Sequence, residues 1–267
     1  MSPLIASAQL VLHSQRIHED AIIHLVARFA FPPPNLFRAF VNQPEASALR
    51  AVRWFHEWHP EPDGYIMEMA ARYDQFAVVR FLHEHRKDSC SAGAVKEAAR
   101  HGNLEMARYL IERVNAPFTK SVLSAAATYG HLHVLQYFLE HVPSLRDKWT
   151  HKVVVRAARY NHLDILQWLL EHQLGVITFE AVQTALNMGH TQVFQYLLMN
   201  SDVECPSRSM DVAAREGDLA LARYLHEVRG IRCTSDDLIE SANHGQVDVA
   251  RYLHEHLTEQ CTPDAIN

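Results

Sequence analysis

Apolar and polar positions recur along this chain in a fixed order. A representative unit runs from Ala125 to Glu140, where three alanines and a Gly-His turn precede a ladder of apolar residues. The glycine of this unit is a convenient marker, and the markers of the successive copies are Asp74, Gly102, Gly130, Asn161, Gly189, Gly217 and Gly245. They are separated by 28, 28, 31, 28, 28 and 28 residues. A fixed period of this length is typical of a solenoid, in which one supersecondary unit stacks on copies of itself.

The residues before each marker predict a first helix, called helix A here. A large apolar side chain stands seven positions before the marker, and the residues four and three before it are mostly alanines, as at Ala98 and Ala99. Such spacings lie on one helical face. Eleven positions before the marker come side chains that can cap a helix start: Asp63, Ser91, Thr119, Thr150, Thr178, Thr234 and Thr262. Pro206 takes this place in the remaining copy, where proline is tolerated as a helix start. We expect helix A to end at the marker, in a left-handed conformation.

The residues after each marker predict a second helix, helix B. Apolar side chains fall two, four, five, seven and eight positions after it, as in Leu132, Val134, Leu135, Tyr137 and Phe138. One helix pair offers too little apolar area to offset the ordering of its own backbone, so the copies must stack to fold. The sequence therefore predicts an all-α fold, an α-solenoid of stacked helix-turn-helix units with essentially no β-structure.

The segment from Ala126 to Leu139, with its alanine pair, Gly-His turn and aliphatic ladder, resembles the ankyrin repeat. Ala98 to Leu110 and Ala213 to Leu225 are similar to it as well, and the resemblance extends over residues 62–258. The Thr-Pro-Leu-His opening of the family is missing, and the period of 28 is about five residues shorter than usual. The resemblance implies that the protruding β-hairpin finger is absent, and that a partner protein binds the concave face formed by the A helices.

Four regions follow from this pattern. Residues 1–35 are expected to form an N-terminal capping helix region, 36–61 a degenerate first repeat, 62–258 seven ankyrin-like repeats, and 259–267 the start of a truncated further repeat. The longer step of 31 residues places its extra residues within 141–148. This insertion is either a tolerated loop or a small projection towards a partner.

The two positions just before each marker are the candidates for partner binding. By the resemblance they face inward along the groove, and Arg and Tyr frequently carry binding energy at interfaces. The candidate residues are Arg72, Tyr73, Arg100, His101, Tyr129, Arg159, Tyr160 and Arg215. The other interpretation is a solvated column that was copied by duplication.

We expect a non-catalytic scaffold or adaptor that binds a partner protein along the concave face. The alternative is binding of nucleic acid or another polyanion along the arginine row, which the net charge of −6 does not favour. No zinc-protease motif, nucleophile elbow or phosphate-binding glycine loop appears in the sequence. We therefore expect no catalytic residue, no cofactor and no metal.

The cysteines and histidines do not form an evident site. Cys90, Cys205, Cys233 and Cys261 occupy one column of the repeat, where stacking separates them by about 10 Å, too far for a disulfide or a shared zinc ion. Unpaired thiols favour a reducing compartment, so we expect an intracellular protein, cytoplasmic or nuclear. Twelve of the 19 histidines fall in repeat columns. Those directly after a marker, His131, His162 and His190, are expected to brace the turn through hydrogen bonds.

At the C-terminus, residues 261–267 restart the repeat in register. This segment is too short to cover the apolar face of Leu238, Ile239, Val249, Tyr252 and Leu253. Either the natural chain continues or this face docks on a second molecule, so end-to-end self-association is a possible outcome. With no secretory signal and no membrane span in the sequence, we expect no membrane partner.

Overall fold

A computed structural model describes residues 44–58, 64–86, 90–143 and 149–260. All secondary structure in these ranges is helical, which confirms the predicted all-α fold. The chain divides into two compact units, the first of residues up to Ala98 together with Asn103–Phe118, and the second of Ala99–Gly102 and the residues from Thr119 on. The domain boundaries expected from the sequence remain predictions, and the expected N-terminal capping helix lies outside the described residues.

In unit 1, helix α4 precedes the first regular pairs. The helices are α4 (Glu45–Trp58), α5 (Gly64–Arg72), α6 (Phe76–Phe81), η1 (Leu82–Arg86), α7 (Ala92–His101) and α8 (Leu104–Glu112), with the last residues of α7 belonging to unit 2. The backbone N–H of Ala77 donates to Glu45 Oε1 at 2.8 Å. Because Gln75, the residue at the cap of α6, makes no side-chain capping bond, the carboxylate of Glu45 satisfies this helix start from another helix.

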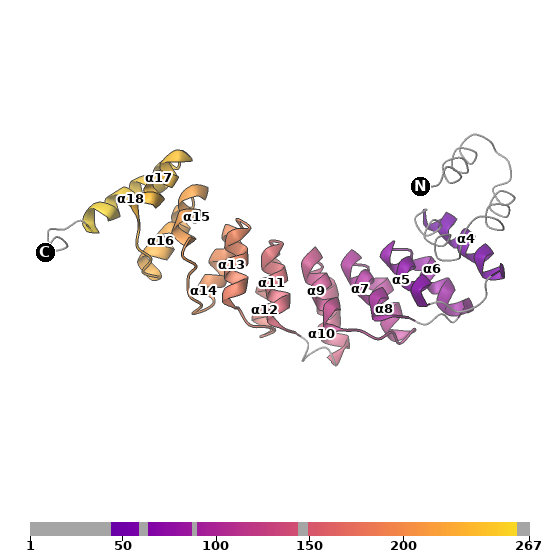
Figure 1. Ribbon diagram of the computed structural model, residues 1–267. Helices are drawn as coiled ribbons and strands as arrows, with labels where there is room; N and C mark the ends of the chain where they lie inside the picture. Colours follow the sequence, from indigo (N-terminus) through magenta and orange to yellow (C-terminus); the bar gives the residue numbers. More distant parts are fainter. Residues whose placement is uncertain (1–43, 59–63, 87–89, 144–148, 261–267) are drawn as a thin grey trace, which may run out of the picture. The chain divides into compact units, whose positions relative to one another are not determined.

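Unit 2 continues the alternation of A and B helices. Its helices are α9 (Lys120–Tyr129), α10 (Leu132–His141), α11 (His151–Arg159), α12 (Leu163–Glu171), α13 (Phe179–Asn187), α14 (Thr191–Met199), α15 (Ser209–Glu216), α16 (Leu219–Arg223), η3 (Tyr224–Val228), α17 (Ser235–Asn243) and α18 (Val247–Gln260). Helix α11 packs against α9 on one side and α13 on the other, and α15 packs against α17 (Figure 1). Each A helix also packs against the B helix that follows it.

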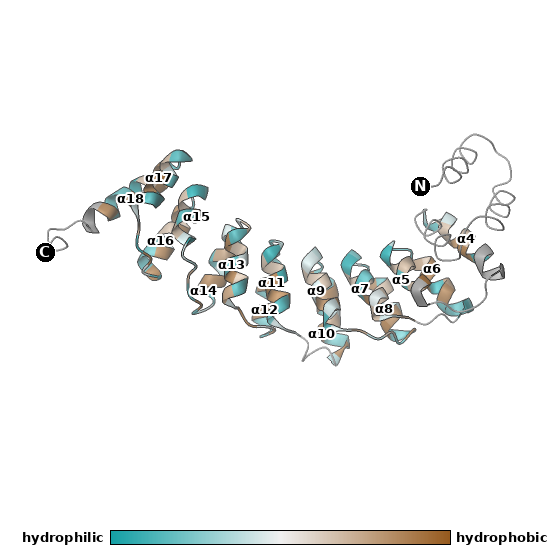
Figure 2. Cartoon of the chain, viewed as in Figure 1, coloured by the Kyte–Doolittle hydropathy of each residue, from teal (hydrophilic) through white to brown (hydrophobic). Residues whose placement is uncertain are grey.

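Small side chains pack between neighbouring A helices, and large side chains pack on the B helices. Ala126, Ala157 and Ala185 are completely buried, and their small size lets neighbouring A helices approach closely. Large buried side chains such as Phe138 and Phe194 fill the space on the B helices. Figure 2 shows the hydropathy pattern of one A helix, α11, in which hydrophobic residues lie between hydrophilic residues at the two ends.

The threonines predicted at helix starts occupy the cap positions of α9, α11, α13 and α17. Only two of them use the side chain for capping: Thr178 accepts from the N–H of Ala181, and Thr234 forms a reciprocal capping box with Asp237. The expectation for Pro206 is wrong, because α15 begins three residues later, at Ser209. Ser209 donates from both its N–H and its hydroxyl to the carbonyl of Pro206, so a turn occupies the expected first helical turn.

Every marker has a positive φ, as the left-handed end of helix A requires. The angle is 79° at Gly130, 74° at Gly217, 61° at Asn161 and 56° at Asp74. Glycine, asparagine and aspartate are the residues that tolerate this conformation best. Markers of different residue types therefore all adopt the same left-handed backbone conformation.

Candidate functional site

The candidate residues at the two positions before each marker are called the candidate row. The row is best defined in unit 2, where its side chains lie on the surface. Arg100 and Tyr129, from successive repeats, form a pair on the surface. Arg100 Nε donates to the Tyr129 hydroxyl at 2.9 Å, and the guanidinium carbon lies 5.1 Å from the centre of the Tyr129 ring. The hydrogen bond and the cation–π contact hold both side chains in defined positions while Tyr129 remains 47% exposed.

The next repeats extend this row with exposed side chains. Tyr160 is 46% exposed and Met188 is 48% exposed, and each stands directly before its marker. Arg159 is exposed, and its guanidinium makes no ion pair or hydrogen bond with the described residues. Neighbouring repeats thus present two tyrosines, one thioether and two guanidinium groups to solvent. The exposure expected for these positions is confirmed, whereas their role in binding remains a prediction.

Two other arginines of the row are held by carboxylates. In unit 1, Arg72 lies 3.4 Å from Glu68 and 4.0 Å from Glu97, beside the half-buried Tyr73. In unit 2, Arg215 Nε lies 3.2 Å from Glu216 Oε1. His101 is exposed beside Arg100. The positive charge of Arg72 and Arg215 is therefore partly offset, so the arginine positions are chemically unequal.

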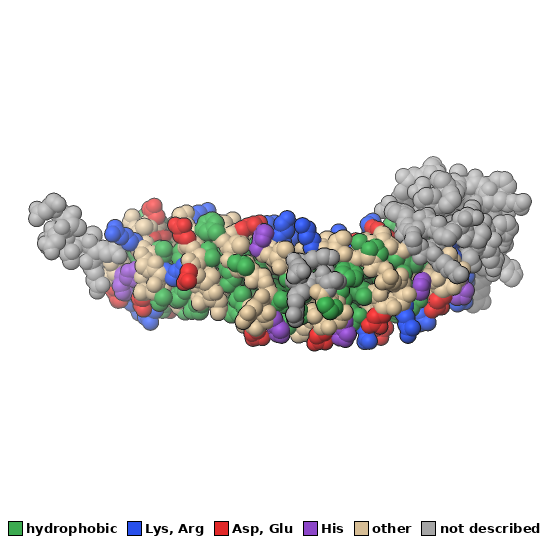
Figure 3. Space-filling model, turned by 90° about the horizontal axis from the view of Figure 1, so that it is seen from below, with side chains coloured by type: hydrophobic (Ala, Val, Ile, Leu, Met, Phe, Trp, Pro, Cys, Tyr) green, Lys and Arg blue, Asp and Glu red, His purple; other side chains and the backbone are tan. Residues whose placement is uncertain are grey.

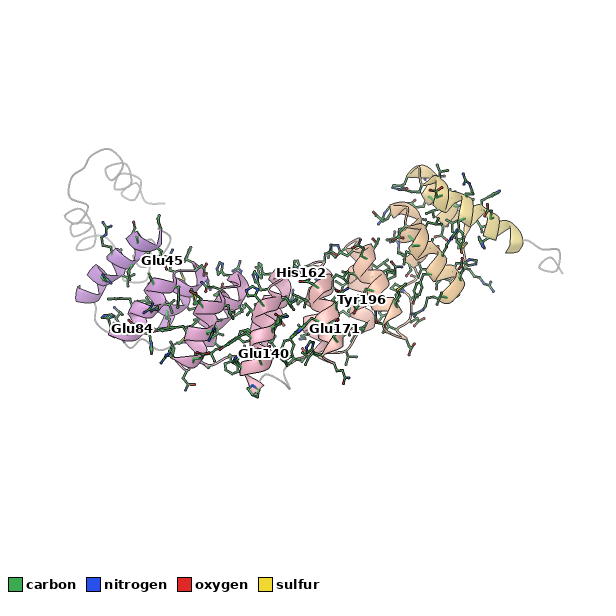
Figure 4. All side chains as sticks on the ribbon, turned by 180° about the vertical axis from the view of Figure 1, so that it is seen from behind. Glu45, Glu84, Glu140, His162, Glu171 and Tyr196 are labelled. Carbon is green, nitrogen blue, oxygen red and sulfur yellow. The ribbon has the colours of Figure 1, made fainter. Side chains whose placement is uncertain are left out.

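Histidines directly after a marker tie one repeat to the one before it, which confirms their expected bracing role. Nε2 of His131 donates to the carbonyl of Arg100 at 2.9 Å, and Nε2 of His190 donates to the carbonyl of Arg159 at 3.0 Å. His162, labelled in Figure 4, does the same to Thr128. Gln246 replaces histidine in the last complete repeat and donates to the carbonyl of Arg215. These bonds fix the backbone of the residues that carry the row.

Burial weakens the basicity of one of these histidines. The pKa of His131 is lowered, chiefly because burial disfavours the charged ring, and His133, His162 and His101 lower it further. The hydrogen bond to Arg100 acts in the opposite direction. His131 therefore connects two repeats as a neutral ring at neutral pH.

The sequence reasoning missed a second recurring cluster, on the B helices. Nδ1 of His226 lies 2.9 Å from the hydroxyl oxygen of Tyr252 in the next repeat. This hydroxyl group donates a hydrogen bond to Glu227 Oε1 at 3.1 Å. Burial and the hydrogen bond to Glu227 raise the pKa of Tyr252 to about 12. The equivalent group in unit 1 is formed by His83, Glu84 and Tyr109.

Both clusters lie where helix B widens into a π-helical turn, η3 and η1. The signal in the sequence was a recurring segment of an arginine, an aromatic residue, leucine, histidine and glutamate. It occurs at Arg80–Glu84, Arg223–Glu227 and Arg251–Glu255, and the first two segments carry the clusters. In unit 2 the glutamates at this end of the B helices, such as Glu140 and Glu171, lie at the opposite end of the repeats from His162 (Figure 4).

The cysteine column contains free thiols at the three positions that the structure describes, Cys90, Cys205 and Cys233. Burial raises the pKa of Cys90 to about 12, so this thiol is a packing residue and a poor nucleophile. Within the described ranges, no three His, Cys, Asp or Glu side chains are placed to hold a metal ion together. Cys261 lies outside these ranges.

Comparison with family models decides the classification. A model described as ankyrin repeats (3 copies) matches residues 97–178 and 123–209, and a second, described as ankyrin repeats (many copies), matches residues 67–111. The matches together extend over residues 67–209, more than half of the chain. The chain belongs to the ankyrin-repeat family. No curated protein matches it.

Ankyrin repeats are generally modules for protein–protein interaction and are typically non-catalytic. In this ankyrin-repeat protein the helix pairs continue past the matched region, through α15 to α18. None of the helices in the described ranges is both long and apolar enough to cross a membrane.

Proposed function

We propose that this ankyrin-repeat protein is a non-catalytic scaffold or adaptor that holds a partner protein along the surface of its A helices. The observation that carries the proposal is the exposed row of Arg100, Tyr129, Arg159, Tyr160 and Met188. In this row Arg100 and Tyr129 hold each other, and histidines of the next repeat fix the carbonyls of Arg100 and Arg159. Aromatic and arginine side chains held in place before binding lose little conformational entropy on association. Their arrangement on rigid helices is what a protein-binding surface requires.

A polyanion bound along the whole arginine row is the alternative function. The acidic neighbours of Arg72 and Arg215 disfavour it, because Glu68, Glu97 and Glu216 would repel a continuous chain of phosphates. The net charge of −6 acts in the same direction at long range. A protein partner, which can place charges only where they are complementary, suits the row better.

Affinity capture followed by mass spectrometry tests the proposal. Tyr129→Ala/Tyr160→Ala should remove the captured partner, because it deletes two exposed aromatic side chains without touching a core position. Met199→Ala/Val228→Ala is the matched control, since these residues are 55% and 66% exposed but lie outside the row. Loss of the partner from the control variant, or its retention by the tyrosine variant, would contradict the proposal.

A further inference from the structure

Helix α11 carries an unusual charge pattern. Lys152, Arg156 and Arg159 are all exposed and stand four and three residues apart, so they form one stripe along the helix. The helix contains no acidic residue, and neither does the neighbouring α9, which adds the exposed Lys120. Figure 3 shows Lys and Arg side chains gathered over this part of unit 2.

The stripe is not neutralised by the rest of the described chain. None of its three cations forms an ion pair with a described carboxylate, and Glu180 on α13 does not pair with them either. Elsewhere the exposed arginines are commonly matched by an acid in the same or a neighbouring helix, as in Arg72–Glu68, Arg80–Glu84, Arg108–Glu112, Arg208–Asp211 and Arg215–Glu216. Among the described helices that carry these pairs, each has an acid close to its arginine, whereas α11 presents three exposed cations and no acidic residue.

This pattern is partly unfavourable for the helix itself. Like charges at spacings of three and four residues repel one another, and Lys152 in the first turn opposes the helix dipole, although Arg156 and Arg159 in the last turn favour it. A local conflict between sequence and stability of this kind is expected where a surface serves binding. In a chain of net charge −6, a concentrated positive stripe attracts negative groups to one place.

We propose that the α11 stripe (Lys152, Arg156 and Arg159) binds an acidic segment of the partner protein, with Tyr160 and Met188 accepting an adjacent apolar side chain. This inference rests on the proposed scaffold function and names the chemistry of its partner. The stripe extends over seven residue steps, which is about 10 Å along a helix. Three residues of a polyproline II chain rise about 9 Å and complete one turn, so carboxylates three residues apart lie on one face and can meet both ends of the stripe.

A carboxylate-bearing segment fits this surface better than a nucleic acid. The positive region is confined to α9, α11 and the nearby Arg100, whereas α13 presents Glu180 and α15 presents Asp211 and Glu216. A nucleic acid strand carries charge along its whole length and would meet these acids. A short acidic segment meets only the stripe, where Arg156 and Arg159 can each form charge-assisted hydrogen bonds with carboxylates.

Fluorescence anisotropy with synthetic probes tests the inference on the full chain. The probe is a labelled 12-residue peptide with Glu at every third position and Leu, Phe and Ser between, and its counterpart has Gln in place of Glu. The acidic peptide should bind at least about tenfold more tightly than the Gln peptide, and its affinity should fall between about 50 mM and about 200 mM salt. An oligothymidylate of 12 nucleotides is the competing probe, and tighter binding of it would overturn the inference in favour of a polyanion surface.

Variants then locate the binding site. Lys152→Gln/Arg156→Gln/Arg159→Gln should weaken the acidic peptide about tenfold or more. Arg108→Gln/Arg223→Gln/Arg251→Gln is the control, because it removes the same charge from equivalent positions of B helices and should change the affinity less than about twofold. Equal losses in both variants, or no binding of the acidic peptide at all, would show the inference to be wrong.

The same variants separate this inference from the scaffold proposal. Partner capture that is lost in Tyr129→Ala/Tyr160→Ala and retained in the α11 triple variant would leave the scaffold function intact and overturn the acidic-segment inference. Capture that is lost in the α11 triple variant and retained in Tyr129→Ala/Tyr160→Ala would support the stripe and contradict the tyrosine row.

Discussion

Arg100 and Tyr129 form a hydrogen-bonded cation–π pair across two successive repeats. The guanidinium group keeps its positive charge on the surface while the tyrosine limits its motion. The backbone beneath it is fixed as well, because the carbonyl of Arg100 accepts from His131. A candidate binding residue is thus ordered by the next repeat.

The first prediction concerns how much the arginines of this row contribute to partner binding and to the stability of the fold. Changing Arg100 and Arg159 to Ala should weaken partner capture strongly and leave the melting temperature almost unaltered, because both side chains are exposed and an exposed cation–π contact contributes only about 0.5 kcal/mol. Thermal unfolding followed by circular dichroism measures the second effect. A drop in the free energy of unfolding above about 3 kcal/mol would mean that these arginines are structural.

A second prediction compares two markers that share a backbone shape but differ in their surroundings. Gly130 and Gly245 have φ angles of 79° and 72°. A methyl group at Gly130 would lie 2.6 Å from Cε1 of His162, whereas at Gly245 it would meet no atom within 4 Å. Both substitutions to Ala should cost about 1 kcal/mol through the left-handed conformation, and Gly130→Ala should cost more because His162 must move.

Urea denaturation of both variants provides the measurement, with Gly245→Ala as the internal control for the backbone cost. If His162 can move away freely, the two variants will lose the same free energy of unfolding, and the steric part of the prediction fails. A greater loss for Gly245→Ala would contradict the structure at that turn.

The third prediction concerns the acid sensitivity of His131. Its pKa is lowered by burial, so the unfolded chain binds this proton more tightly than the folded chain does. The contribution of His131 to stability is therefore complete above its unfolded pKa of about 6.5 and is lost as pH falls through the lower folded value. His131→Gln should reduce the loss of stability on going from pH 7.5 to pH 5.

Glutamine is the appropriate substitute because Gln246 makes the equivalent bond to the carbonyl of Arg215. Free energies of unfolding at the two pH values, for wild type and His131→Gln, give the comparison. An unchanged difference between the two pH values would show that His131 does not contribute to acid sensitivity. His244→Gln is a suitable control, since His244 is exposed.

A fourth prediction concerns the last described helix pair. Ile239 on α17 and Val247 on α18 are 56% and 64% exposed, and fewer large side chains of this pair are buried than in the central repeats. Amide hydrogens of residues 232–260 should therefore exchange much faster than those of residues 98–170. Hydrogen exchange with mass spectrometry checks this, and uniform protection in dilute monomer would contradict it. Protection that rises with protein concentration would indicate end-to-end association.

The candidate site was only partly foreseeable from the sequence. The columns before the markers identified Arg100, Tyr129 and Tyr160 as exposed candidates because their place in the repeat is periodic. The sequence could not show that carboxylates partly offset the charge of Arg72 and Arg215, whereas Arg159 pairs with no carboxylate of the described residues. Those differences depend on rotamers and on neighbours in adjacent turns, which a repeat pattern does not specify.

The sequence by itself determined the helix pairs and the left-handed turns between them. Apolar spacing specifies a helical face locally, and Gly130 or Asn161 permits a positive φ through its own covalent structure. Only the tertiary structure decided how repeats are joined. The bonds of His131 to Arg100 and of His226 to Tyr252 connect residues 31 and 26 positions apart. Such contacts exist only after the helices stack, because packing sets their geometry. The repeat columns show which side chains recur but do not show which atoms of a neighbouring repeat they meet.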